Sequence, residues 1–152
     1  MKKSIHHFWE QFLNTHALGK LPCPQSFYFC DNRQDADACA TLVVKGIKQA
    51  TAPSLWWFDT HKENRPEVGD YHIITQWDGT PVAVIQTTAV AVIPFEQVGA
   101  GFAYAEGEGD RSLAQWQEVH RAYYAREMDC EPSEITDDFA VVCHHFQTVF
   151  CA

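Results

Sequence analysis

The sequence predicts a single domain of the α+β class. Three observations lead to this expectation: an amphipathic helix near the start, a hairpin signal at Asp78 and Gly79, and a long final strand over residues 138–150. That strand is apolar on both faces, which suits the interior of a barrel packed beneath helices. The chain has 152 residues, enough for one hydrophobic core but not for two.

The composition is that of a globular and acidic protein. Apolar residues make up 46%, whereas Lys plus Arg number 11 against 20 Asp plus Glu, for a net charge of −9. Binding to long nucleic acid depends on neutralising phosphates with cations, so this balance opposes tight, sequence-independent binding. The negative net charge is compatible with a local basic cleft or with a small uncharged ligand such as a nucleoside.

Neither a membrane span nor a secretion signal is predicted. No apolar run approaches the ~20 residues that a span needs. His6, His7 and Glu10 interrupt any signal-peptide core, so we expect a cytoplasmic protein with no membrane partner.

The cysteines are expected to be free thiols in a reducing compartment. None of the six forms a Cys-x-x-Cys pair, so neither a zinc site nor a redox motif is expected. A metal role for Cys143 with His144 and His145 is the less favoured alternative.

The first elements follow from apolar spacing and capping residues. Residues 4–16 form a helix with one apolar stripe, and residues 26–30 form a short strand. Asp31 and Gln34 have the form of a capping box that begins a second helix. Gly46 ends that helix, because glycine accepts the left-handed conformation found there. The residues that follow, 48–51, form a turn leading to a strand at 54–58.

The second half of the chain alternates strands and turns before a last helix. After a polar loop at 59–69, residues 71–77 and 82–93 form two strands joined at Asp78 and Gly79. Pro94 closes the second strand. A Gly-rich acidic loop then leads into a helix whose apolar face carries Leu113, Trp116, Val119, His120 and Tyr123.

Three motifs together resemble the activating signal cointegrator homology (ASCH) domain family. They are Gly46-x-Lys48-x-x-Thr51, Val68-Gly69-Asp70-Tyr71, and Phe102-Ala-Tyr-Ala-Glu-Gly-Glu-Gly-Asp-Arg-Ser-Leu113 followed by Trp116-x-x-Val119-His120. The resemblance covers roughly residues 33–151 and keeps the order of the elements. It implies a small PUA-like β-barrel with flanking helices, preceded by a helical extension over about residues 1–25 of the single domain 1–152.

The resemblance also implies an activity. Some bacterial members are amidohydrolases of N4-acetylcytidine, and others have been linked to RNA binding or cleavage. The amidohydrolases imply Thr51 as nucleophile, Lys48 as its base and Glu108 as the third catalytic residue, with Glu106 as the close alternative for Glu108. No cofactor and no metal are expected.

The residues themselves set conditions for this chemistry. On a helical turn Lys48 and Thr51 lie together, whereas on a regular strand they point to opposite faces. A lysine can act as base only if its pKa falls, which an apolar wall from residues 56–58 would favour and a nearby carboxylate would oppose. Backbone N–H groups of the 48–51 turn would hold the oxyanion. The plain alternative is a solvated lysine, a threonine that begins a strand, and a Glu108 that simply favours a helix start.

Further residues are candidates for substrate contact. A pyrimidine could stack on Tyr104 or Trp56, because stacking tolerates any base face. Ser54, Arg65 and Arg111 are polar candidates, although each is more often simply exposed. His120 is expected to be a core histidine with its hydrogen bonds satisfied rather than a catalyst.

Two hypotheses follow. The first is an amidohydrolase acting on the N4-acyl amide of a small nucleoside. The second is an RNA-binding module with weak ribonuclease activity, using the same cleft for an unpaired nucleotide. No arginine stands between Thr51 and Arg65, which together with the charge of −9 weakens the RNA hypothesis. A cationic cleft would favour RNA, and a small pocket around the three catalytic residues would favour the enzyme. The oligomeric state does not follow from the sequence.

Overall fold

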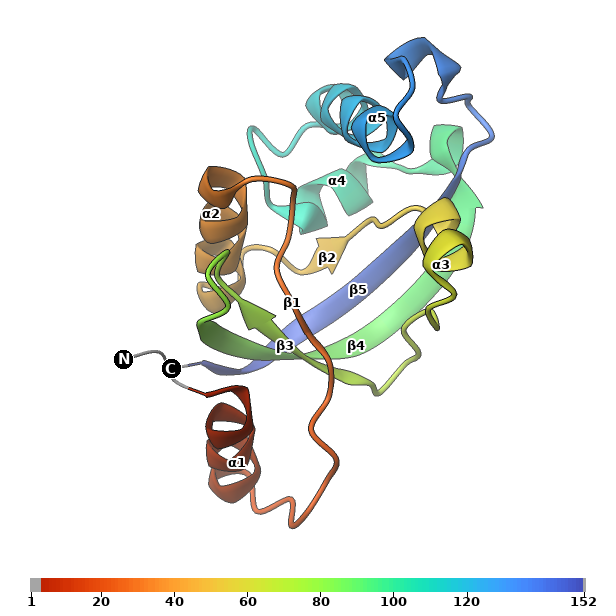
Figure 1. Ribbon diagram of the computed structural model, residues 1–152. Coiled ribbons are helices and arrows are strands. Elements are labelled where there is room, and N and C mark those ends of the chain that lie inside the picture. The colour runs from red at the N-terminus through yellow and green to blue at the C-terminus, as the bar shows by residue number, and fades with distance from the viewer. Residues whose placement is uncertain (1–3, 152) are drawn as a thin grey trace.

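A five-stranded sheet forms the centre of the computed structural model, which describes residues 4–151 (Figure 1). Its strands, in spatial order, are β1 (Ser26–Phe27), β3 (Tyr71–Thr75), β4 (Pro81–Pro94), β5 (Ala140–Cys151) and β2 (Ala50–Thr51). β1 pairs with β3 in parallel, and the other neighbours are antiparallel. The α+β class is therefore confirmed. Within residues 4–151 the hydrogen-bonded order ends at β1 and β2, so the sheet is open and a closed barrel is not confirmed.

The long β4–β5 pair gives the sheet its curvature. Its register runs from Ala83 opposite Cys151 to Pro94 opposite Ala140. Two irregularities interrupt it, one between Val84 and Ile85 and one between Thr87 and Ala89. Because bulges bend a strand and increase its twist, the pair curves across the molecule, as Figure 1 shows.

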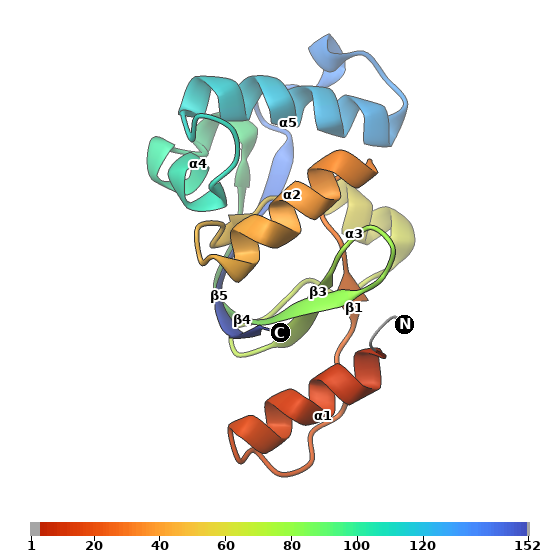
Figure 2. The ribbon, with the colours of Figure 1, turned by 90° about the vertical axis from the view of Figure 1, so that its left-hand side faces the viewer.

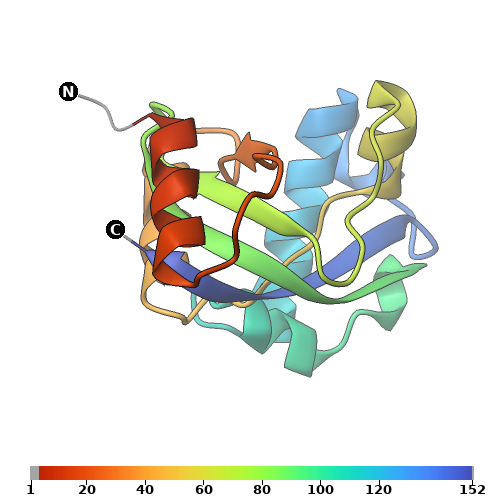
Figure 3. The same ribbon diagram turned by 90° about the horizontal axis from the view of Figure 1, so that it is seen from below.

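Helices cover both faces of the sheet. They are α1 (Ile5–Thr15), α2 (Arg33–Val44), α3 (Leu55–His61), α4 (Ala100–Glu106) and α5 (Leu113–Met128). Figures 1 and 2 show α1 on one side and the other four helices on the opposite side. Seen from below, α1 lies across the strands (Figure 3).

This arrangement explains why the central strands are apolar on both faces. Ile73 packs in one cluster with Phe8 and Phe12 of α1, whereas its neighbour Ile74 packs with Val43 of α2 on the other face. Successive side chains of a strand point to opposite sides, so the central strands β3 and β4 supply side chains to two separate clusters. A third cluster lies under α4 and α5 and is built around Phe95, Phe102, Trp116 and Tyr124.

Several expectations about the elements are confirmed. The predicted first helix, the hairpin at Asp78 and Gly79, the two long strands and the last helix are all present. Gly46 follows the end of α2 with a φ of 74°. No helix within residues 4–151 has the length and apolar character needed to cross a bilayer.

Other expectations are wrong. Residues 55–61 are helix α3 rather than a strand, because the Ser54 hydroxyl accepts a hydrogen bond from the Trp57 amide at 3.0 Å and caps the helix. The strand lies earlier, at β2, so Ala50 and Thr51 belong to a strand and not to the turn expected at 48–51. Asn32 rather than Asp31 caps α2, by accepting from the Asp35 amide at 2.9 Å. Helix α4 occupies the first part of the segment expected to be a Gly-rich loop.

Candidate active site

A pocket of about 780 Å³ opens on the helical side of the sheet. It is bounded by the β1–α2 segment, β2, α3, α5 and the loop between α4 and α5. We call it the central pocket. Lys48, Thr51 and Glu108, the three catalytic residues predicted from sequence, all line it.

Lys48 is held by the end of α2. After the reversal at Gly46, the amides of Ile47 and Lys48 both donate to the Leu42 carbonyl, at 2.9 and 3.1 Å. This turn directs the lysine side chain inward, where only 1% of the residue is exposed. Because a buried ammonium needs partners, the contacts of its Nζ decide what the residue can do.

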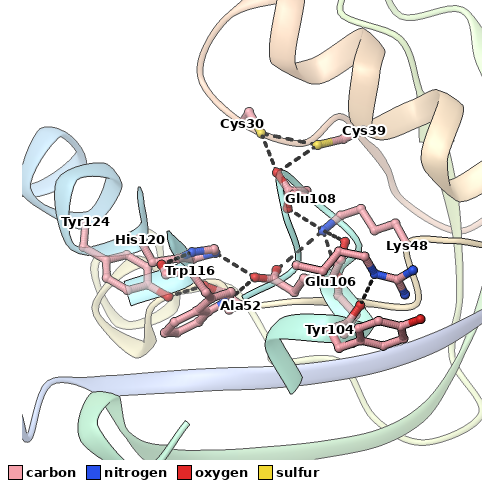
Figure 4. A network of polar contacts seen from close by, with 12 residues as sticks. Cys30, Cys39, Lys48, Ala52, Tyr104, Glu106, Glu108, Trp116, His120 and Tyr124 are labelled. Atoms are coloured by element: carbon pink, nitrogen blue, oxygen red, sulfur yellow. Dashed lines mark hydrogen bonds and ion pairs between the residues drawn. The ribbon is translucent and has the colours of Figure 1, made fainter. Parts of the chain in front are cut away.

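The Lys48 ammonium lies among oxygen acceptors (Figure 4). Its Nζ donates to the Ala50 carbonyl at 2.8 Å and to Glu108 Oε2 at 2.8 Å, and it lies 3.5 Å from Glu106 Oε1. Burial alone would lower the pKa of Lys48, but the carboxylates of Glu106 and Glu108 more than offset it and raise that pKa above its ordinary value. The lysine is therefore charged, and the carboxylates outweigh the expected apolar wall.

Glu106 is the buried anion of the site. It is 2% exposed and accepts hydrogen bonds from Trp116 Nε1 and, at 2.8 Å, from His120 Nε2. Burial would raise the pKa of Glu106, but the positive charges of Lys48 and His120 lower it. Glu106 is thus an ionised structural partner of Lys48, whereas Glu108 has a side chain that is 33% exposed and can reach a ligand.

His120 has both ring nitrogens engaged, as expected of a satisfied core histidine. Nδ1 lies 2.9 Å from the Trp116 carbonyl, which can only accept, and Nε2 faces Glu106. Both nitrogens therefore donate, which identifies the ring as imidazolium. Burial alone would lower the pKa of His120, but Glu106 outweighs this and raises it. The two cations and the two carboxylates, Glu106 and Glu108, form a network whose charges balance.

Thr51 and Glu108 reach the central pocket from different elements. Thr51 lies on β2, whose pairing with β5 places it opposite His144. Glu108 lies between two glycines of positive φ, Gly107 at 74° and Gly109 at 59°. Such backbone is costly for other residues, so the glycines allow the tight loop that aims Glu108 at Lys48.

The backbone N–H groups of residues 48–51, which were expected to hold the oxyanion, are not all free to do so. The Lys48 amide already donates to Leu42, and the Gln49 amide donates to the Ala105 carbonyl at 2.7 Å. Two of the expected N–H donors are therefore used inside the protein. Lys48 is the remaining candidate for stabilising an oxyanion, because it is the positive charge nearest to Thr51 in the sequence.

The substrate-contact candidates mostly lie elsewhere. Ser54 is fully buried and donates to Glu127 Oε1 at 2.6 Å, which together with its cap of α3 makes it structural. Tyr104 is 59% exposed and carries the Arg111 guanidinium 3.4 Å above its ring. Arg65 lines a second, open hollow of about 800 Å³ that adjoins the central pocket at Asn64 and Pro66. Trp56 is half-buried and is not among the lining residues of the central pocket.

Most of the other residues that line the central pocket were not identified from the sequence. Its aromatic wall is made of Phe27, Tyr28, Phe29, Trp57, Phe58 and Tyr123, of which Trp57 and Phe58 belong to the apolar wall expected from the sequence. The charged lining residues are six acids, Asp31, Asp35, Glu63, Glu106, Glu108 and Glu127, and three cations, Lys48, Arg126 and the imidazolium of His120. The central pocket is therefore acidic, unlike a phosphate-binding cleft.

Two thiols adjoin this network. Cys39 Sγ lies 3.2 Å from Glu108 Oε1, and Cys30 Sγ lies 3.7 Å from Cys39 Sγ (Figure 4). These three residues are the ones in the described part of the chain whose ligand atoms lie close enough together to hold a metal ion.

Comparison with known proteins identifies the family. The ASCH domain model matches residues 25–150, most of the chain. This protein belongs to the ASCH domain family. The match includes the motifs that carry Lys48, Thr51 and Glu108, and it leaves α1 outside.

Solved structures support the same assignment. An ASCH domain from Lactobacillus crispatus JV V101 is 35% identical, with a TM-score of 0.84 over 95% of this chain and 92% of that chain. A protein from Enterococcus faecalis V583 is 32% identical, with a TM-score of 0.84 over 95% of this chain and 87% of that chain. The hypothetical protein PH0355, 15% identical with a TM-score of 0.51 over 83% of this chain and 97% of that chain, shares the fold alone. No match was found among curated proteins.

Proposed function

We propose that this ASCH domain hydrolyses the N4-acyl amide of acylated cytidine or a related nucleoside. One observation carries the proposal: Lys48, Thr51 and Glu108 line one acidic pocket, and Lys48 and Glu108 form an ion pair at 2.8 Å. A hydroxyl nucleophile, an amine and a carboxylate in one pocket are the groups that acyl transfer requires.

The charged state of Lys48 defines how the base must work. An ammonium cannot accept the Thr51 proton, so Lys48 must first lose its own. Glu108 is its proton acceptor, since the two groups already share a hydrogen bond of 2.8 Å. Substrate that displaces water lowers the local polarity, which disfavours the ion pair relative to the neutral amine and carboxylic acid.

The proton transfers of the first half-reaction then involve three residues, Lys48, Thr51 and Glu108. Neutral Lys48 takes the proton of Thr51 as its oxygen attacks the acyl carbon, and the re-formed ammonium stabilises the oxyanion. Protonated Glu108 gives its proton to the leaving N4 nitrogen as the C–N bond breaks. The products of this half-reaction are cytidine and acyl-Thr51. Water then attacks the ester carbonyl of acyl-Thr51. The Lys48–Glu108 pair takes a proton from this water and passes it to the Thr51 oxygen as the C–O bond breaks, which releases the carboxylic acid.

The lining of the central pocket indicates the kind of substrate. Six acids against three cations, Lys48, Arg126 and His120, leave the central pocket with an excess of negative charge that repels phosphate, which favours an uncharged nucleoside over a nucleotide or RNA. The rings of Phe29 and Trp57 offer apolar surface against which a pyrimidine can pack. The alternative, an RNA-binding module, has no such support from the charge of the pocket.

The test is turnover of N4-acetylcytidine, measured as cytidine released on a chromatography column. We expect Thr51→Ala to abolish it, Thr51→Ser to retain part, and Thr41→Ala, an exposed threonine on α2, to leave it unchanged. Lys48→Arg should be inactive, because guanidinium is effectively never deprotonated. A Lys48→Arg protein that turns over at nearly the wild-type rate would refute the base role of Lys48.

A second comparison separates the two functions. The 5′-monophosphate of N4-acetylcytidine should be hydrolysed more slowly than the nucleoside, and a fluorescent single-stranded RNA should bind weakly. If RNA binds tightly, Lys48→Arg preserves that binding and no N4-acyl nucleoside is hydrolysed, the RNA hypothesis replaces ours.

A further inference from the structure

A cluster of two thiols and one carboxylate borders the central pocket and has no part in the acyl-transfer scheme apart from Glu108. We propose that Cys30, Cys39 and Glu108 bind one divalent cation of the zinc class. The site goes beyond the proposed hydrolase, because its two sulfur ligands have no role in that reaction.

The distances match the edges of a zinc tetrahedron. Bond lengths of about 2.3 Å to sulfur and about 2.0–2.2 Å to oxygen place two sulfurs about 3.8 Å apart and sulfur and oxygen about 3.5 Å apart. The two Sγ atoms are 3.7 Å apart, and Glu108 Oε1 lies 3.2 Å from Cys39 Sγ and 4.0 Å from Cys30 Sγ. Shifts of about half an ångström or less therefore make room for the ion.

The backbone at Cys30 adds a second observation. Cys30 has a φ of 68°, a left-handed conformation that is uncommon for a residue with a side chain. Residues held in such conformations concentrate at functional sites. Here the conformation belongs to the residue whose thiol meets Cys39 of α2 and Glu108 of the α4–α5 loop (Figure 4).

The ligand types select the metal. Two thiolates favour zinc and other soft or borderline ions over magnesium and calcium, which prefer oxygen ligands. Binding displaces the protons of both thiols to solvent, so it strengthens as pH rises. Glu108 coordinates through Oε1 and keeps its Oε2 on Lys48 at 2.8 Å.

The coordination is also incomplete within the cluster. Three protein ligands leave one position of the tetrahedron for water or another small ligand. Cys30 and Glu108 both line the central pocket, so that position is reachable from it. The expectation of no metal rested on the missing Cys-x-x-Cys spacing, and these cysteines stand nine residues apart.

The experiment is a cobalt titration of reduced, chelator-treated protein without oxygen. We expect one equivalent of Co²⁺ to bind, with thiolate-to-cobalt charge transfer in the near ultraviolet and tetrahedral bands in the visible, and Zn²⁺ to displace it. Cys30→Ser and Cys39→Ser should each weaken binding by roughly 100-fold or more, and Glu108→Gln by at least about 10-fold.

Cys143→Ser is the matched control, since Cys143 is also a buried free thiol but lies outside the cluster. It should leave the cobalt spectrum unchanged, and circular dichroism checks that each variant is folded. Thr51→Ala should still bind cobalt while losing amide hydrolysis, so failure of the hydrolase and failure of the metal site are distinguishable. Absence of thiolate charge transfer with one equivalent of Co²⁺, or its equal loss in Cys143→Ser, would overturn the proposal.

Discussion

Replacing Lys48 by methionine tests the charge network directly. Methionine keeps an unbranched chain of similar length but carries no ammonium. A turn residue with little buried area would tolerate substitution at a cost under about 1 kcal/mol. Lys48 is instead fully buried and faces two carboxylates, so a larger loss is expected.

The magnitude follows from the contacts. At the 3.5 Å between Lys48 Nζ and Glu106 Oε1, unit charges attract by about 5 kcal/mol at an effective dielectric constant of 20. Removing one partner of a buried pair costs about 3–5 kcal/mol, since the other charge is left without compensation. His120 still faces Glu106 at 2.8 Å, so we expect the lower end, about 3 kcal/mol. For a domain of this size the melting temperature should fall by roughly 6–12 °C.

Urea unfolding at pH 7 measures the loss. The matched control is Lys45→Met, the same change at an exposed position, which should alter stability by less than about 0.5 kcal/mol. Glu106→Gln in the Lys48→Met background should restore part of the loss, because the neutral amide keeps an oxygen for Trp116 Nε1. A loss under 1 kcal/mol, or a double variant less stable than Lys48→Met, would refute the reasoning.

The same comparison has a pH dependence. The folded-state pKa of Glu106 is lowered, so its contribution to stability is present above its unfolded pKa of about 4.3 and is lost as pH falls through the folded value. The stability gap between wild type and Lys48→Met should therefore narrow below about pH 4. A gap that stays constant there would assign the effect to lost packing rather than to charge.

Two further predictions concern the surroundings of the network. A Cβ on Gly107 would lie 2.9 Å from the Ile47 carbonyl oxygen, so Gly107→Ala should destabilise the fold by about 1–3 kcal/mol more than Gly79→Ala. Gly79 is the control, because it shares a positive φ but faces open space. Equal losses of stability in urea unfolding would contradict the clash. The pKa of His120 is raised by Glu106, so its stabilisation is complete below its unfolded pKa of about 6.5 and is lost as pH rises through the folded value. The stability difference between wild type and His120→Gln should thus shrink with rising pH, and a difference constant from pH 5 to 9 would show that the ring is not ionised in the fold.

The elements that could be predicted are those with local causes. The stripe of α1, the turn at Gly46 and the hairpin at Gly79 depend on residues close in sequence. The strand expected at 54–58 is wrong because aromatic residues favour strands in general, whereas the Ser54 cap decides for a helix here. Helix α4 was missed because Gly101 inside it and Gly99 and Gly107 at its two ends suggested a loop.

The sequence motifs identified some residues of the candidate site but not the contacts between them. The family resemblance named Lys48, Thr51 and Glu108, which line one pocket. It could not show that Glu106 would be buried against Lys48, because that contact spans 58 residues of chain. Nor could spacing detect the Cys30–Cys39 pair, which depends on how the β1–α2 segment folds back.

The charge network explains why Lys48 cannot be considered by itself. Burial in an apolar setting would give a neutral amine ready to act as base, but a neutral Lys48 would remove one of the cations that face Glu106 and leave His120 to balance it. The fold keeps the lysine charged through Glu106, which is buried and fixed, and through Glu108, which is half-exposed and reachable by a ligand. Only Glu108 can therefore change its protonation or its partner without unbalancing the core. Both proposals converge on this residue: it takes the proton that frees the amine, and its second oxygen meets the thiol pair.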